Sequence, residues 1–147
     1  MFVLGIDPGL SRCGYGCVEA RPDGPRAVAI GVITTAPSLP LPERLAELQA
    51  ELRALLVELR PQAVAVERVF FQNNVRTAMS VGQASGLAMA EAVAAGCDVV
   101  QYTPNQVKEA VTGNGAADKE MVQTMVQTLL RLSAPPRPAD AADAAAL

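Results

Sequence analysis

The hydrophobic positions divide the chain into short apolar runs and longer stretches with helical spacing. The short runs are rich in β-branched residues and are bounded by Gly, Pro or charged residues, a pattern typical of strands. It predicts five strands, at 2–6, 14–20, 27–35, 63–66 and 98–102. Apolar residues that recur every three or four positions predict helices. These helices are expected at 43–59, 75–95, 104–111, 117–132 and 140–147.

The order of these elements predicts the fold class. Short links, one of them an Asp-Gly turn at 23–24, join the first three strands, so we expect an antiparallel meander. The later strands alternate with helices, which indicates parallel crossovers and a mixed α/β sheet of five strands with helices on both faces. This is the element order of the ribonuclease H-like fold. At 147 residues we expect one domain over 1–147, with a last helix of about two turns that is cut short.

The composition excludes several kinds of site. The sequence has no histidine, which excludes a histidine-based catalytic triad and a histidine-ligated zinc site. Its three cysteines have no C-x-x-C spacing and are typical of reduced core residues in a cytoplasmic protein. The chain has no apolar run of about 18 residues and no basic segment at its start, so neither a membrane span nor secretion is predicted. With a net charge of −3, any binding to nucleic acid must use a local face of Arg and Lys.

Four acidic residues are candidates for a metal site. Asp7 and Glu67 each close an apolar strand, and in a mixed sheet those two strands can be neighbours. Asp140 and Asp143 are three residues apart at a helix start, so both lie on one helical face. Carboxylate oxygens suit Mg²⁺ or Mn²⁺, and two such ions can promote in-line attack at phosphorus. The alternative is that Asp7 only forms the turn that follows it and that the helical pair only favours a helix N-terminus.

Several short motifs occur in an order that covers nearly the whole chain. They are Gly5-Ile6-Asp7-Pro8-Gly9, Gly14-Tyr15-Gly16, Glu67-Arg68-Val69-Phe70, Gln83-Ala84-Ser85-Gly86, Gln106-Val107-Lys108, Gly113-Asn114-Gly115-Ala116-Ala117-Asp118-Lys119 and Asp140-Ala141-Ala142-Asp143-Ala144. Each motif alone is weak, but together they resemble the RuvC family of Holliday-junction resolvases.

The resemblance implies an activity. It implies a homodimeric endonuclease that nicks two symmetric strands of a four-way DNA junction during recombination and repair. The products would carry 5′-phosphate and 3′-hydroxyl ends, and RuvA and RuvB, the branch-migration proteins, would be partners. The four metal-binding acids of the family match Asp7, Glu67, Asp140 and Asp143. They would hold two Mg²⁺ ions, with Mn²⁺ able to substitute.

Basic, aromatic and amide side chains are the candidate DNA contacts. Lys119, which follows a glycine-rich turn, can neutralise charge in the transition state, and its alternative role is that of an ordinary solvated helix residue. The resemblance supports catalysis by Lys119 and a phosphate contact by Lys108, and it matches Phe70 to the family's stacking aromatic. Arg12 and Arg76 are candidate backbone contacts. The Asn pair at 73–74, Asn73 and Asn74, would contact DNA or cap the helix that follows.

Three other functions compete with this one. Sugar-kinase-like phosphotransferases also begin with a strand, an Asp and a glycine turn, but they need two such domains. Another ribonuclease H-like nuclease could act on RNA. A non-catalytic dimeric DNA-binding module is the third. Whichever function holds, the small residues of the helix at 75–95 are a candidate surface for dimerisation.

Overall fold

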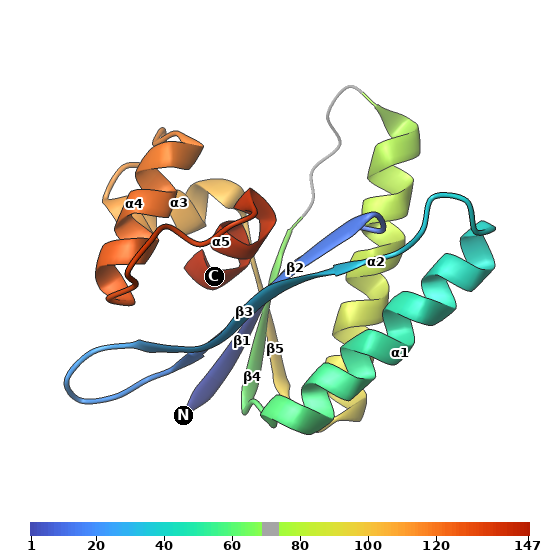
Figure 1. Ribbon diagram of the computed structural model, residues 1–147, viewed down its shortest axis with the longest axis horizontal. Coiled ribbons are helices and arrows are strands. Elements are labelled where there is room, and N and C mark those ends of the chain that lie inside the picture. Colours follow the sequence, from blue (N-terminus) through green and yellow to red (C-terminus); the bar gives the residue numbers. More distant parts are fainter. Residues whose placement is uncertain (69–73) are drawn as a thin grey trace.

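The computed structural model describes residues 1–68 and 74–147, which form a five-stranded sheet with helices on both faces (Figure 1). The strands are β1 (Phe2–Asp7), β2 (Arg12–Glu19), β3 (Arg26–Thr34), β4 (Ala63–Glu67) and β5 (Asp98–Tyr102). The helices are α1 (Leu41–Leu59), α2 (Val75–Ala94), α3 (Pro104–Thr112), α4 (Lys119–Leu129) and α5 (Ala139–Ala146). The predicted element order is confirmed.

The strands are arranged in the order β3-β2-β1-β4-β5. β1, β2 and β3 pair antiparallel, whereas β4 pairs parallel with both β1 and β5. Both the predicted meander and the predicted parallel crossovers are therefore present. β1 is the central strand and lies between β2 of the meander and β4 of the crossovers. Residues at its end can therefore meet residues from both parts of the sheet.

The two faces of the sheet carry separate hydrophobic cores. On one face, α1 and α2 pack against the strands through residues such as Leu48 and Leu52, which are almost fully buried. On the other face, α4 and α5 enclose a smaller cluster that includes Val122 and Val126 (Figure 1). The three cysteines are free and buried, as predicted. In the described part of the chain, no helix has both the length and the apolar character needed to cross a membrane.

Every strand except β5 differs from its predicted limits by one or two residues. β2 begins at Arg12 rather than at residue 14, because Arg12 already pairs with Thr34 of β3. β3 ends at Thr34 rather than at residue 35, because its pairing with β2 ends at Arg12, and the hydroxyl of the next residue, Thr35, donates to the Leu10 carbonyl at 2.6 Å. This bond ties the end of β3 to the turn that follows β1.

The predicted helix over 117–132 is too long at both ends. α4 begins only at Lys119, because the Asp118 side chain accepts from the Met121 N–H at 2.9 Å and so caps the helix start. It ends at Leu129, and Arg131 then has a positive φ of 54°, which ends helical geometry. The other elements end within two residues of their predicted limits.

Candidate active site

The ends of β1 and β4 bring two carboxyl groups together. The strands are parallel neighbours, and Ile6 pairs with Val66. The next residues, Asp7 and Glu67, therefore leave the same edge of the sheet side by side. Their carboxyl groups share a hydrogen bond. The structure thus unites the two acids that the sequence placed at strand ends.

The position of α5 depends on glycines in the strands beneath it. At Gly14 of β2, a Cβ atom would collide with the main-chain oxygen of Asp140. At Gly16 a Cβ atom would lie 2.7 Å from the Cα atom of Ala145. Absence of side chains here lets the helix backbone rest directly on the sheet. Glycines inside a strand often mark a close approach by backbone or ligand, and here the approaching group is the α5 backbone.

Through this packing, α5 adds two carboxylates to those of the strands. Asp7, Asp140 and Asp143 each present an oxygen that lies within 4.8 Å of the others. Glu67 extends the group through its hydrogen bond to Asp7. We call these four residues the acidic cluster. Acidic residues from three distant parts of the sequence therefore lie close together at one edge of the sheet.

Burial and mutual repulsion change the protonation of the acidic cluster. Burial, and secondarily the nearby Glu67 carboxylate, raises the pKa of Asp7 to about 8. Burial also raises the pKa of Glu67 and of Asp143. Without a cation, the cluster therefore holds protons at pH values where free carboxylates are charged.

The donor set of the acidic cluster fits a divalent cation. All its ligand atoms are carboxylate oxygens, which hard cations such as Mg²⁺, Mn²⁺ and Ca²⁺ prefer. Three of these oxygens are close enough to surround one position. A cation there would stabilise the charged carboxylates against the burial and the mutual repulsion that raise the pKa of Asp7. Both the chemistry and the spacing of the residues are therefore suited to a metal.

The raised pKa values predict how the stability of the metal-free protein depends on pH. In the folded state Asp7 keeps its proton up to about pH 8, whereas the unfolded chain releases it near pH 3.8. Between these values the folded state binds more protons, so the free energy of unfolding falls as pH rises. We expect the melting temperature measured in chelator to fall between pH 5 and pH 8. The Asp7→Asn variant should show a smaller fall, and an equal fall in both proteins would contradict the assignment to Asp7.

Three basic side chains surround the acidic cluster. The Lys119 Nζ atom lies 3.7 Å from Asp143 Oδ2, at the first residue of α4. Lys108 on α3 lies near enough to offset part of the rise in the Asp143 pKa. The Arg12 Nη1 atom lies 4.0 Å from Asp140 Oδ2. The sequence singled out all three residues, and the structure places them beside the carboxylates.

The remaining predicted contacts fall into separate groups. Arg12 and Arg76 line one groove of about 660 Å³, which starts at the turn directly after Asp7. Asn74 caps α2, because its side chain accepts from the N–H groups of Arg76 and Thr77, in the first turn of the helix, at 3.2 and 3.4 Å. Phe70 and Asn73 lie outside the described residues.

Arg44 is a residue of this region that the sequence analysis missed. Its Nε atom donates to Thr35 Oγ1 at 3.0 Å, and its Nη2 atom donates to Ser11 Oγ at 2.9 Å. Buried Thr35 in turn donates to Leu10 in the turn after β1. Arg44 thus fixes the turn that follows Asp7 and also lines the groove of Arg12 and Arg76. Its partners are distant in the chain, so no local pattern could have indicated it.

Comparison with known proteins identifies relatives over the full length of the chain. The family model described as crossover junction endodeoxyribonuclease RuvC matches residues 3–147. The RuvC protein of Salinispora arenicola is 57% identical, over 100% of this chain and 85% of that protein. That of Syntrophomonas wolfei is 48% identical, over 100% of this chain and 86% of that protein.

Solved structures agree with the sequence matches. Thermus thermophilus RuvC superposes with a TM-score of 0.91 at 40% identity, covering 99% of this chain and 90% of that one. The structure of T. thermophilus RuvC in complex with Holliday junction substrate gives a TM-score of 0.93 at 41% identity, covering 99% of this chain and 89% of that one. The resemblance seen in the sequence motifs is confirmed, and the chain belongs to the RuvC family of crossover junction endodeoxyribonucleases.

Proposed function

We propose that this protein resolves four-way DNA junctions by paired, symmetric nicks during recombination and repair. The observation that carries the proposal is the acidic cluster, in which oxygens of Asp7, Asp140 and Asp143 lie within 4.8 Å of one another and Glu67 is hydrogen-bonded to Asp7. The T. thermophilus relative was solved with a Holliday junction substrate and shares the fold over nearly all of this chain. Membership of this nuclease family also implies the use of divalent metal ions.

In this proposal Asp7, Glu67, Asp140 and Asp143 hold two Mg²⁺ ions, and Mn²⁺ can substitute. Bound cations would lower the pKa of the attacking water and stabilise the leaving oxygen. The protein's own contribution is to fix the carboxylates before the DNA arrives. β1 and β4 are rigid parallel neighbours, and α5 rests on them without intervening side chains. Sites built on strands and helices are more precise than sites on loops.

Lys119 is proposed to stabilise the negative charge that develops on the scissile phosphate. Its ammonium group already lies near Asp143, at the N-terminus of α4. We expect Lys119→Met to lower the rate of the cutting step by about 10²-fold, because one preorganised charged group is lost. Single-turnover kinetics at saturating protein should show this change with little change in junction affinity.

A matched control separates charge from packing at this position. Lys119→Arg keeps the positive charge and should retain more activity than Lys119→Met. Glu120, the next residue, is exposed on the same helix, and Glu120→Gln should leave the rate within about threefold of the wild type. Unchanged cutting by Lys119→Met would refute a catalytic role and leave Lys119 as a solvated helix residue.

The DNA is proposed to follow the basic side chains next to the acidic cluster. Arg12 and Arg76 share a groove with Arg44, and this groove begins where β1 ends. Three arginines in one groove are suited to backbone phosphates. Lys108 would add a phosphate contact on the other side of the carboxylates. Phe70 would stack on an unpaired base, and Asn73 and Asn74 would add polar contacts.

Two symmetric nicks require two active sites, so we propose a homodimer. Several of the small residues of α2 pack inside the fold, among them Ala84, Ala88 and Ala92. The opposite side of this helix exposes Val75 and Val93, at 69% and 65% of their surface. Such an apolar stripe is suited to burial against a second copy. Sedimentation giving a monomer at working concentration would contradict this interface.

A cleavage assay on defined substrates tests the proposed activity. Synthetic four-way junctions should be cut into nicked duplexes only with Mg²⁺ or Mn²⁺, and linear duplex should remain intact. Preferred cutting of an RNA–DNA hybrid would instead select a ribonuclease H-like enzyme that acts on RNA. Metal-dependent binding without any cutting would indicate a non-catalytic junction-binding module.

The cellular setting completes the proposal. We propose that residues 1–147 act as a single nuclease domain in the cytoplasm, where the three buried thiols stay reduced. RuvA and RuvB would supply branch migration, as the family resemblance implies. Retention of this protein by immobilised RuvA and RuvB on junction DNA would test that partnership.

A further inference from the structure

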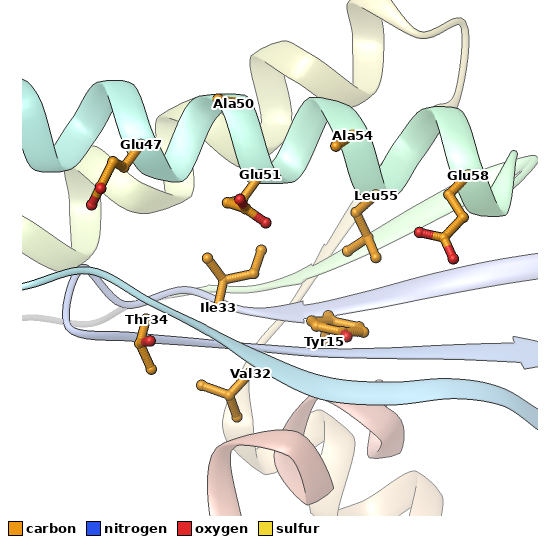
Figure 2. Close-up of a pocket in the computed structure, with 10 residues that line it drawn as sticks. All are labelled: Tyr15, Val32, Ile33, Thr34, Glu47, Ala50, Glu51, Ala54, Leu55 and Glu58. Carbon is orange, nitrogen blue, oxygen red and sulfur yellow. The ribbon is translucent and has the colours of Figure 1, made fainter.

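A groove far from the acidic cluster runs between α1 and the edge strand β3. It has a volume of about 520 Å³. Figure 2 shows Ile33 and the Tyr15 ring along the strands, with the side chains of α1 pointing down toward them. The groove therefore has a partly apolar floor made by the meander and a wall made by one helix.

The edge of β3 has the properties of a strand that pairs with another chain. β3 ends the sheet order and spans nine residues, whereas the opposite edge strand, β5, spans five. Between Ala27 and Thr34 it carries no charged residue, and Val28 exposes 47% of its surface. Proteins usually blunt such edges with charges, prolines or short length, so a long apolar edge is a template for an added strand.

The wall of the groove that α1 forms is acidic, which favours a basic occupant. Glu47, Glu51 and Glu58 are exposed on one face of α1 and all line the groove. Among the described residues that line it, none is basic. The arginines of the helix face elsewhere, since Arg53 pairs with Glu91 of α2 at 2.8 Å and Arg44 binds the turn after β1. These carboxylates would repel DNA and attract lysine or arginine side chains.

The spacing of the carboxylates fits an extended chain. Glu47 and Glu51 lie one turn apart, which is about 6 Å along the helix axis. Alternate residues of a strand lie about 7 Å apart and point to the same side. Basic residues two positions apart in an added strand would therefore meet Glu47 and Glu51, and a third basic residue, about three positions further along, would meet Glu58. Two copies of β3 pairing with each other would instead bring two acidic walls together, which disfavours self-association through this edge.

We propose that this groove binds an extended, basic segment of a partner protein, which pairs with β3 as a sixth strand beneath the carboxylates of α1. The main-chain hydrogen bonds of β3 would supply affinity, and the three glutamates would select lysine and arginine. The segment would leave the acidic cluster free, because that cluster lies at the end of β1, on the side of the sheet covered by α5.

The test uses a labelled peptide of eight alternating lysine and valine residues and measures binding by fluorescence anisotropy. The wild-type protein should bind it, and a glutamate–valine peptide should not bind. Glu51→Lys/Glu58→Lys should weaken binding by about tenfold or more. A single charge reversal at the other sheet edge, Asp98→Lys, should have little effect, whereas Glu51→Lys alone should already weaken binding. Junction cutting should be the same for all these variants and the wild type.

Two further measurements identify the mode of binding. A lysine–valine peptide with alternate N-methylated amides keeps its charge but cannot pair with β3, so its affinity should fall at least about tenfold. Equal affinity for the methylated peptide would overturn strand addition. Loss of binding in Asp7→Asn, but not in the glutamate variant, would place the peptide at the acidic cluster and overturn the proposal. A change of oligomeric state in Glu51→Lys/Glu58→Lys would identify a second copy as the occupant and also overturn it.

Discussion

Asp7→Asn is expected to lower the single-turnover rate of junction cleavage by on the order of 10³-fold or more. Asparagine keeps the shape of the side chain but removes a negative charge from the centre of the acidic cluster. Asp7 lies between Glu67, which shares its hydrogen bond, and Asp140 and Asp143, whose oxygens are within 4.8 Å. In the variant, a cation placed among these groups therefore loses the carboxylate that lies next to both Glu67 and the two acids of α5.

Junction binding should survive the same substitution. The arginines proposed to contact phosphate lie in the groove beyond the turn, and the substitution leaves them unchanged. We expect the dissociation constant of Asp7→Asn to stay within about threefold of the wild-type value in Ca²⁺ or chelator. Asp98→Asn, at the opposite end of the parallel strands, is the matched control and should cut normally.

Stability measurements distinguish a catalytic role of Asp7 from a structural one. Burial raises the pKa of Asp7 to about 8, so the charged form is unfavourable in the folded protein without metal. At pH 8 in chelator, Asp7→Asn should therefore melt no lower than the wild type. Saturating Mn²⁺ should raise the melting temperature of the wild type more than that of the variant. Joint loss of folding and binding would instead mean that Asp7 is a structural turn residue.

Local sequence patterns predicted those parts of the fold that depend on local contacts. The helix expected at 104–111 begins at Pro104, and the preceding Thr103 caps it, because the Thr103 hydroxyl accepts from the Gln106 N–H at 3.1 Å. Apolar runs that end on Asp7 and Glu67 predicted two acids at strand ends, and the sheet places them together. In these cases the determining residues lie within a few positions of one another.

Features that depend on distant residues could not be predicted in the same way. The Thr35 and Arg44 side chains act on the turn after β1, across segments that the sequence separates by more than twenty residues. The sequence placed Asp140 and Asp143 on one helical face, but it did not place that face over β1. That position depends on where α5 meets the glycines of the strands. A glycine in a strand predicts close approach without identifying the approaching element.

Gly14→Ala is expected to disable the acidic cluster without touching any of its carboxylates. The added methyl group would collide with the main-chain oxygen of Asp140, at the start of α5. The helix must then move away from β2, and Asp140 and Asp143 must move with it. A displacement of about 1 Å at a catalytic group can cost about 10²-fold in rate. We expect a loss of at least this size in single-turnover cleavage, together with a smaller melting-temperature shift on addition of Mn²⁺.

Gly31→Ala provides the control, because it introduces the same methyl group into the neighbouring strand. There the methyl group meets the Tyr15 ring, on the side of the sheet that α1 covers. Both substitutions should destabilise the fold by about 1–3 kcal/mol, the usual cost of overpacking. At a temperature where both variants are folded by circular dichroism, only Gly14→Ala should lose cleavage. Wild-type cleavage by Gly14→Ala would show that α5 can shift on the sheet without displacing the carboxylates, and equal losses in both variants would assign the effect to general strain in the meander.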